Sequence, residues 1–233
     1  MTPNEANGGD IVLAPPVHYG FNEHNMDFPG TVSIDPQNFI NYVFEIARSF
    51  ATMGFQYMLI ANGHGSNHIL LEVVARLATV RTSLKCASFS YWQLASEAVD
   101  RLRESEFPGG MSHACEFETS VYMHLDPEHV QHDHIQREVW HSGSDLIWTD
   151  LLASSPVRFV DWWSARSKTG TNGDATVATP EKGREFVETA AGNILQLARD
   201  FRQAEFGHRE SFQPAAETRR DSAVGQVCTG GTR

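Results

Sequence analysis

A short apolar segment, residues 57–61, runs directly into a glycine-containing motif at 62–67, and this succession constrains the fold more than any other feature. The segment has the length of a buried strand. Residues 69–84 carry apolar side chains at helical spacing, and the buried face of this helix is predicted to consist of Leu70, Val73, Val74, Leu77 and Val80. A strand that ends in a glycine turn and opens a helix places unpaired backbone N–H groups at the carboxyl edge of a sheet, where open α/β sheets bind ligands. His64 is therefore a candidate site residue. The alternative is a plain strand-to-helix loop whose glycines permit positive φ.

Further strands and helices are expected to alternate along the chain. Residues 10–14 and 86–91 are predicted to be strands, and Asp35 before proline is a good N-cap for a helix that ends near residue 54. A long amphipathic helix is expected at 180–206. This alternation predicts an α/β domain with a mostly parallel sheet that helices cover on both faces.

Length and composition indicate a single core. The chain has 233 residues, 41% hydrophobic and 20% charged, which are ordinary values for a globular domain. We expect one domain over residues 1–206. Residues 207–233 have little to bury and are expected to form a disordered tail.

The formal charge of -11 argues against nucleic acid or an anionic membrane surface as a partner, because either would require a basic face. No apolar run approaches the roughly 20 residues that span a bilayer, so no membrane partner is expected. Three cysteines, Cys86, Cys115 and Cys228, stand at unrelated spacings that suit reduced thiols. Together with a start that has no signal region, this predicts a cytoplasmic protein.

The segment 17–34 is a long loop without a clear period, a kind of loop that is often functional. It contains mixed polar and aromatic side chains that either line a pocket or face solvent: His18, Tyr19, Glu23, His24 and Asp27. A second histidine group between residues 122 and 141 is irregularly spaced, which favours a solvated loop over a metal site.

A second glycine-containing loop leads to a candidate acid–base pair. Ser112 is predicted to cap a helix, and His113 and Glu118 would then lie about 140° apart around it, close enough to act together. A histidine and a glutamate at a helix start can transfer protons or bind a metal ion. For Glu116 we favour a structural role as a first-turn acid that complements the helix dipole.

These motifs resemble the signatures of the creatininase (creatinine amidohydrolase) family. The resembling segments occur in the family's order: 28–31, 62–67, 90–92, 113–120, 169–174 and 178–183. The resemblance implies a three-layer α/β/α domain, assembly into homo-oligomers that are often hexamers, and a divalent metal such as zinc, manganese or iron. It also implies hydrolysis of C–N bonds in small cyclic or linear amides.

The resemblance also implies roles for individual residues. His64 looks like a metal ligand, and Glu118 like a metal ligand or general base. His113 looks like the residue that handles the substrate carbonyl or the leaving nitrogen. Trp92 looks like a pocket wall. Tyr19 and His24 are predicted substrate-binding residues on a different ground, their place in the loop 17–34.

The chain departs from the family pattern at three places. Ser66 stands where creatininase itself has a glutamate ligand, and Cys115 stands where the family usually has glycine. The family's first strand, with its Glu-x-His motif and following Asp, is expected to be missing. The sequence therefore carries two hypotheses, a metal-dependent C–N hydrolase and a truncated or inactive member that serves as a binding or structural subunit. A phosphate-binding glycine turn is a third, weaker one, because the turn has no lysine.

Overall fold

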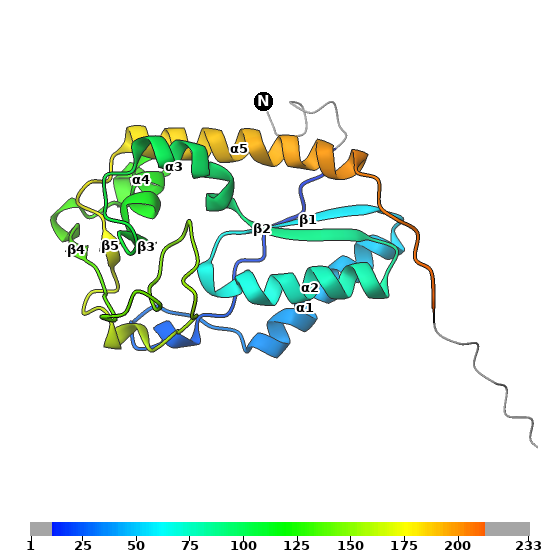
Figure 1. Cartoon of the computed structure of the whole chain (residues 1–233), viewed down its shortest axis with the longest axis horizontal. Helices are drawn as coiled ribbons and strands as arrows, with labels where there is room; N and C mark the ends of the chain where they lie inside the picture. Colours follow the sequence, from blue (N-terminus) through cyan, green and yellow to red (C-terminus); the bar gives the residue numbers. More distant parts are fainter. Residues whose placement is uncertain (1–10, 213–233) are drawn as a thin grey trace, which may run out of the picture. The chain divides into compact units, whose positions relative to one another are not determined.

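Two parallel strands form one of the two sheets of the domain and lie between helices (Figure 1). The computed structural model describes residues 11–212. β1 (Tyr57–Asn62) pairs with β2 (Lys85–Ser90) along its whole length. The helix α2 (His68–Arg81) connects them, as a parallel pair requires. The strand, glycine turn and helix predicted from residue 57 onward are therefore confirmed.

Helices cover both faces of this pair. α1 (Pro36–Thr52) and α2 lie on one side, and the long α5 (Pro180–Gln203) lies on the other (Figure 1). The Asp35 side chain accepts hydrogen bonds from the N–H groups of Gln37 and Asn38, so the predicted N-cap forms. The layers match the predicted α/β/α arrangement.

A small antiparallel sheet lies elsewhere in the domain and was not predicted. Its strand order is β3-β5-β4, with β3 (Met111–His113), β5 (Asn172–Asp174) and β4 (Arg137–Glu138). Strands of two or three residues are too short to show a period of two in the sequence. The sheet nevertheless places His113 at a strand end.

The remaining elements are short helices around the two sheets. They are η1 (Glu23–Asn25), η2 (Gly65–Asn67), η3 (Tyr91–Ala95), α3 (Ser96–Leu102), α4 (Glu116–Leu125), η4 (Pro127–His129), η5 (His132–His134) and η6 (Trp163–Ala165). The segment 17–34 is irregular apart from η1, as expected of a long loop.

Buried apolar side chains form three groups in the described part of the chain. In the largest group, Phe117 of α4 stacks on Phe186 of α5 with ring centroids 4.8 Å apart. In the second, Phe39 and Val43 of α1 pack against Val74 of α2. Such burial contributes roughly 1.5–3 kcal/mol per large side chain.

Two local predictions are wrong. Residues 11–14 form no strand, and Val12 and Leu13 are 63% and 67% exposed, because no neighbouring strand pairs with them in the described residues. The buried face of α2 is also displaced from the predicted one. Leu71, Val74, Ala75 and Ala78 are buried, whereas the predicted Val73 and Val80 are exposed.

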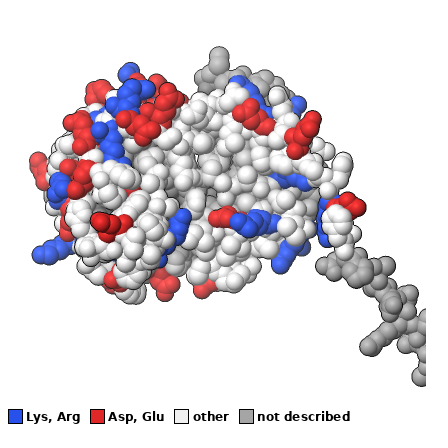
Figure 2. Space-filling view, viewed as in Figure 1, with Lys and Arg blue, Asp and Glu red and all other residues white. Residues whose placement is uncertain are grey.

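The chain divides into a unit ending at Gln203 and a second unit from Ala204. Residues 204–212 have neither helix nor strand and are exposed, and 213–233, with Cys228, lie outside the described residues. The disordered tail therefore stays a prediction. On the face drawn in Figure 2, acidic and basic side chains are intermingled. No helix among the described residues is both long and apolar enough to cross a membrane.

Candidate active site

His113 and Glu118 lie together, although not on one helix as predicted. His113 ends β3, and Glu118 is in the first turn of α4, whose N-cap is Cys115 and not Ser112. The helical angle predicted between them therefore does not apply. His113 Nδ1 is nevertheless 3.7 Å from Glu118 Oε2, because the chain turns sharply between strand and helix.

Ala114, inside that turn, has a positive φ of 46°. This left-handed conformation costs an alanine roughly 1–2 kcal/mol. The Ala114 N–H donates to Glu118 Oε2 at 2.6 Å, which offsets part of the strain and fixes the carboxylate. The turn thus holds the histidine and the carboxylate on the same side.

His64 follows the end of β1 and presents an unpartnered nitrogen. Its backbone N–H donates to Asn62 Oδ1 at 3.1 Å, which sets the turn. Its Nε2 is buried and has no hydrogen-bond partner in the described residues. Burial, and then the nearby His113 and His24, lower the pKa of His64 to about 4, so its imidazole is neutral near pH 7.

His24 belongs to the same group of histidines. Its Nε2 lies 3.1 Å from Ser66 Oγ, so the serine of the glycine motif contacts the loop that carries His24. Burial lowers the pKa of His24, as do the neighbouring His113 and Arg166. His24 thus lies near Ser66, about 40 positions later in the chain, and near His113, about 90 positions later.

Hydrogen bonds join the ends of the parallel strands to the loop. Asn62 Nδ2 donates to Ser90 Oγ at 3.0 Å, and His68 Nδ1 is 3.0 Å from the same oxygen. Asn67 Oδ1 accepts from the N–H of Phe21 at 2.9 Å. The glycine motif therefore holds both the sheet edge and the loop before His24.

A cavity of about 410 Å³ opens beside His113 and Glu118. Its wall continues over uncharged side chains that include Tyr122, Gln131 and Gln136. No lysine or arginine is among its lining residues. The volume lies within the usual range for ligand sites, about 300–1,000 Å³.

None of the three predicted substrate-binding residues, Trp92, Tyr19 and His24, is in the lining of this cavity. Trp92 is 5% exposed and packs in the main hydrophobic core, not in the wall of this cavity. Tyr19 is 58% exposed and does not line it either. His129 of the second histidine group pairs with Asp126 at 2.7 Å on the surface, whereas His134 lines the cavity.

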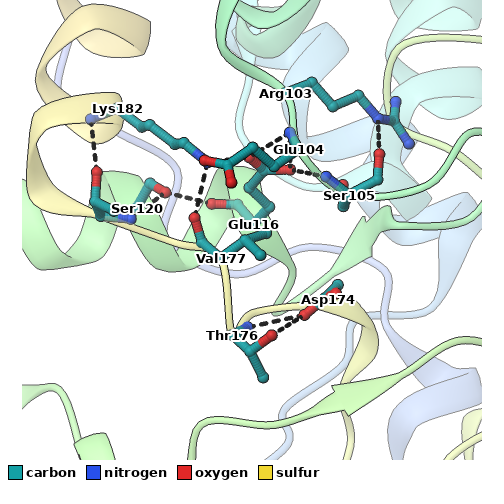
Figure 3. Close-up of polar contacts among 10 residues, drawn as sticks. Arg103, Glu104, Ser105, Glu116, Ser120, Asp174, Thr176, Val177 and Lys182 are labelled. Carbon is teal, nitrogen blue, oxygen red and sulfur yellow. Dashed lines mark hydrogen bonds and ion pairs between the residues drawn. The ribbon is translucent and has the colours of Figure 1, made fainter.

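Glu116 has a structural role, although not the predicted one. Its carboxylate is fully buried and lies 2.6 Å from Lys182 Nζ of α5 (Figure 3). It also accepts from the N–H groups of Glu104 and Ser105. Glu116 therefore ties α4 to α5 and to the preceding loop, and does not merely complement the helix dipole.

Trp163 is a neighbour of the site that sequence reasoning missed. Its ring centroid lies 5.7 Å from that of His24 and 5.4 Å from that of His113, both edge to face. The signal in the sequence was weak, because two adjacent tryptophans in an irregular segment show no period. Of the two, Trp163 is buried and Trp162 is 49% exposed.

A metal ion fits this group of residues only in part. The buried, unpartnered Nε2 of His64 is an atom that a divalent metal could use. Zinc usually takes at least three protein ligands, and within residues 11–212 no three His, Cys, Asp or Glu side chains are placed to hold one ion. The described residues therefore do not make a complete metal site.

The fold and the site define an α/β protein with histidines at or just after strand ends and a glutamate in the first turn of the following helix. Residues 2–198 match the family described as Creatininase: Creatinine amidohydrolase. The chain belongs to the creatininase family, as the sequence motifs predicted.

Similar proteins include two enzymes with different substrates. The chain is 25% identical over 207 residues to the 3-dehydro-scyllo-inosose hydrolase of Thermotoga maritima, covering 81% of this chain and 64% of that protein. It is 31% identical over 189 residues to the Mycofactocin precursor peptide peptidase of Mycobacterium ulcerans, covering 81% and 66%. The chain thus spans slightly less than two thirds of either relative's length.

Solved structures show the same fold. A putative creatinine amidohydrolase from Bacteroides fragilis has a TM-score of 0.70 at 22% identity, with 88% of this chain and 78% of that chain covered. A creatinine amidohydrolase has a TM-score of 0.68 at 24% identity, covering 85% and 78%.

Proposed function

We propose that this chain is a hydrolase that cleaves a C–N bond of a small amide, with His113 and Glu118 as its proton-transferring pair. The observation that carries the proposal is their geometry: His113 Nδ1 is 3.7 Å from Glu118 Oε2, and both side chains line one cavity. A carboxylate and an imidazole at this separation can divide the two proton transfers of amide hydrolysis between them.

In the proposed reaction, water attacks the amide carbon and Glu118 accepts the proton that the water loses. A C–O bond forms, the C–N bond breaks, and His113 supplies a proton to the departing nitrogen and regains one from Glu118. Glu118 Oε2 already accepts from the N–H of Ala114, which holds the carboxylate while Oε1 receives the proton. The products are a carboxylic acid and an amine.

The substrate we propose is uncharged or cationic. The lining of the cavity has a carboxylate, amides and hydroxyls but no lysine or arginine, so an anionic group would meet no complementary charge there. The names of the relatives, a hydrolase of an inosose and a peptidase, are consistent with a hydrolase but differ in substrate.

His64 is the residue we propose for contact with a divalent metal, whether zinc, manganese or iron. Related solved structures are described as Creatininase Mn and as a Zn-Zn type creatininase. Because the described residues do not complete a metal site, the proton transfers above are assigned to His113 and Glu118 alone. Assembly into a homo-oligomer and location in the cytoplasm remain predictions.

The incomplete set of metal donors favours a second candidate function. In that hypothesis the chain is an inactive member of the family that binds a small molecule or pairs with another subunit. Such a protein would retain the cavity and the fold but would not turn over an amide, so activity separates the two hypotheses.

The test is hydrolysis of a panel of creatinine, N-formyl amines and short peptide amides by the purified chain, with and without added Zn²⁺ or Mn²⁺. His113→Asn and Glu118→Gln are each expected to lower kcat/KM by about 10²–10⁴-fold. Matched controls are His129→Asn and Glu128→Gln, at exposed positions outside the cavity lining, which should leave the rate unchanged. Absence of turnover across the panel would favour the second candidate.

A further inference from the structure

A buried indole lies between two of the site's histidines. Trp163 is 9% exposed, and its ring meets the rings of both His24 and His113 at interplanar angles of 66° and 86°. Edge-to-face contacts of this kind are directional, because the aromatic ring has a negative face and a positive edge. The rotation of either imidazole is therefore linked to the position of the indole.

The indole itself is fixed by a hydrogen bond. Trp163 Nε1 donates to the carbonyl oxygen of Gly170 at 2.9 Å. Gly170 has a positive φ of 97°, a conformation that glycine adopts without strain, and its N–H donates to Ser167 Oγ at 2.8 Å. The orientation of Trp163 thus depends on the shape of the loop 167–170.

One carboxylate holds that loop. Glu138 accepts hydrogen bonds from Ser167 Oγ, from the N–H of Lys168 and from Thr169 Oγ1, each 2.8 Å long. Burial alone would raise the pKa of Glu138, but these donors hold it below its ordinary value, so the carboxylate stays charged near pH 7. Glu138 is thus connected to Trp163 through the loop.

The same segment also contacts the cavity and the loop of His24. Thr171, next to Gly170, lines the cavity beside His113. Ser164 of η6 donates a hydrogen bond to Asp27, which follows η1 and its His24. Trp163 therefore lies where the wall of the cavity, the strand end and the long loop meet.

We propose that Trp163 is a positioning residue that holds His24 and His113 in their working orientation, and that Glu138 fixes Trp163 through the loop 167–170. The inference rests on the proposed function for the role of His113 in catalysis. Trp163 is absent from the lining of the cavity, so it acts through the histidines and not on the substrate.

The test compares Trp163→Phe and Trp163→Ala with Trp162→Phe as a matched control, because Trp162 is the adjacent, half-exposed tryptophan. Imidazole proton signals, assigned with His24→Gln and His113→Gln, are recorded by NMR. Both signals are expected to shift in the two Trp163 variants and to stay in place in Trp162→Phe. This measurement does not require turnover, so it remains informative if no hydrolysis is found.

Enzyme kinetics provide a second test of the role of Trp163. On any amide that the wild type hydrolyses, Trp163→Ala should lower kcat by about 10–100-fold through misplacement of His113, with little change in KM. Trp163→Phe keeps a ring but no N–H donor, so a smaller fall is expected. Glu138→Gln leaves the Trp163 residue in place but should still shift the same two NMR signals, because a glutamine has only one acceptor oxygen for the three donors that hold the loop.

Three results would overturn the inference. Unchanged imidazole signals in Trp163→Phe and Glu138→Gln would show that the rings are oriented without the indole. An equal effect of Trp162→Phe would show a general loss of structure. A raised KM with unchanged kcat in Trp163→Ala would make the indole a substrate contact instead of a positioning residue.

Discussion

The buried carboxylate of Glu116 stabilises the helix that carries the candidate site residue Glu118. Glu116 lies two residues before Glu118, and its side chain is fully buried against Lys182. Burial alone would raise the pKa of Glu116, but hydrogen bonds from Lys182 and Ser105 hold it below its ordinary value of 4.5. Glu116 is therefore charged at neutral pH, and its charge is compensated by donors and not by water.

Glu116→Gln is expected to lower the free energy of unfolding by about 3 kcal/mol at pH 7, at the low end of the roughly 3–5 kcal/mol for breaking a buried pair. The low end applies because Lys182 keeps its 2.7 Å contact with Glu104. The new amide N–H₂ would also face backbone donors. Urea unfolding measures the loss, and Glu181→Gln, at an exposed acid in the same helix as Lys182, is the matched control.

The destabilisation caused by Glu116→Gln is expected to depend on pH. Since the pKa of Glu116 is depressed in the folded protein, its stabilisation is fully present above pH 4.5 and is lost as the pH falls through the folded pKa. The difference between the wild type and Glu116→Gln should therefore shrink below pH 4.5. A difference that stays constant from pH 7 to below pH 4.5 would contradict the charged state assigned to Glu116.

The candidate site residues could be chosen from the sequence, but their arrangement in space could not. His64, His113 and Glu118 were chosen from the sequence because few other residue types transfer protons or bind metals beside glycine turns. Their grouping with His24 depends on long-range contacts such as that of Asn67 with the N–H of Phe21, which no local pattern encodes. For the same reason Trp163 was missed, and Trp92, which the resemblance placed at the pocket, lies in the core.

At the scale of elements, the contact between α4 and α5 is close enough to require glycine. A Cβ atom added at Gly183 would lie 1.9 Å from the carbonyl oxygen of Ser120, which is backbone and cannot turn aside. At Gly192, further along the same helix, an added Cβ atom would meet nothing within 4 Å, and this position is exposed. The two glycines therefore differ in packing while sharing one helix.

Gly183→Ala is expected to destabilise the protein by about 1–3 kcal/mol through overpacking, because α5 must move away from α4. Gly192→Ala is the matched control and should stabilise it by roughly 0.5–1 kcal/mol, since alanine has the higher helix propensity. Thermal unfolding of both variants checks the opposite signs. A Gly183→Ala protein as stable as Gly192→Ala would disprove the close approach.

Elements defined by local signals were the ones that sequence predicted well. The Asp35 cap and the period of α5 act within a few residues, and both elements formed as expected. The strand expected at 10–14 depended on a pairing partner, and in the described residues it has none. β3, β4 and β5 exist only because they pair with each other, so their short sequences carry no signal.

At the scale of the whole molecule, the question is whether the entire chain binds a divalent metal. The described residues offer the buried Nε2 of His64 but no group of three donor side chains within 11–212. A complete structural zinc site contributes roughly 10–16 kcal/mol of binding free energy. One histidine with scattered neighbours should bind far more weakly, and the binding should depend on His64.

Equilibrium dialysis of the purified 233-residue chain against Zn²⁺ and Mn²⁺ tests this directly. We expect a Kd weaker than about 1 μM, which corresponds to roughly 8 kcal/mol, and further weakening in His64→Gln. His129→Gln, at an exposed surface histidine, is the matched control and should change nothing. Tight stoichiometric binding that survives in His64→Gln would contradict the assignment of His64. Tight binding lost in that variant would mean that His64 has ligand partners beyond those that residues 11–212 bring together.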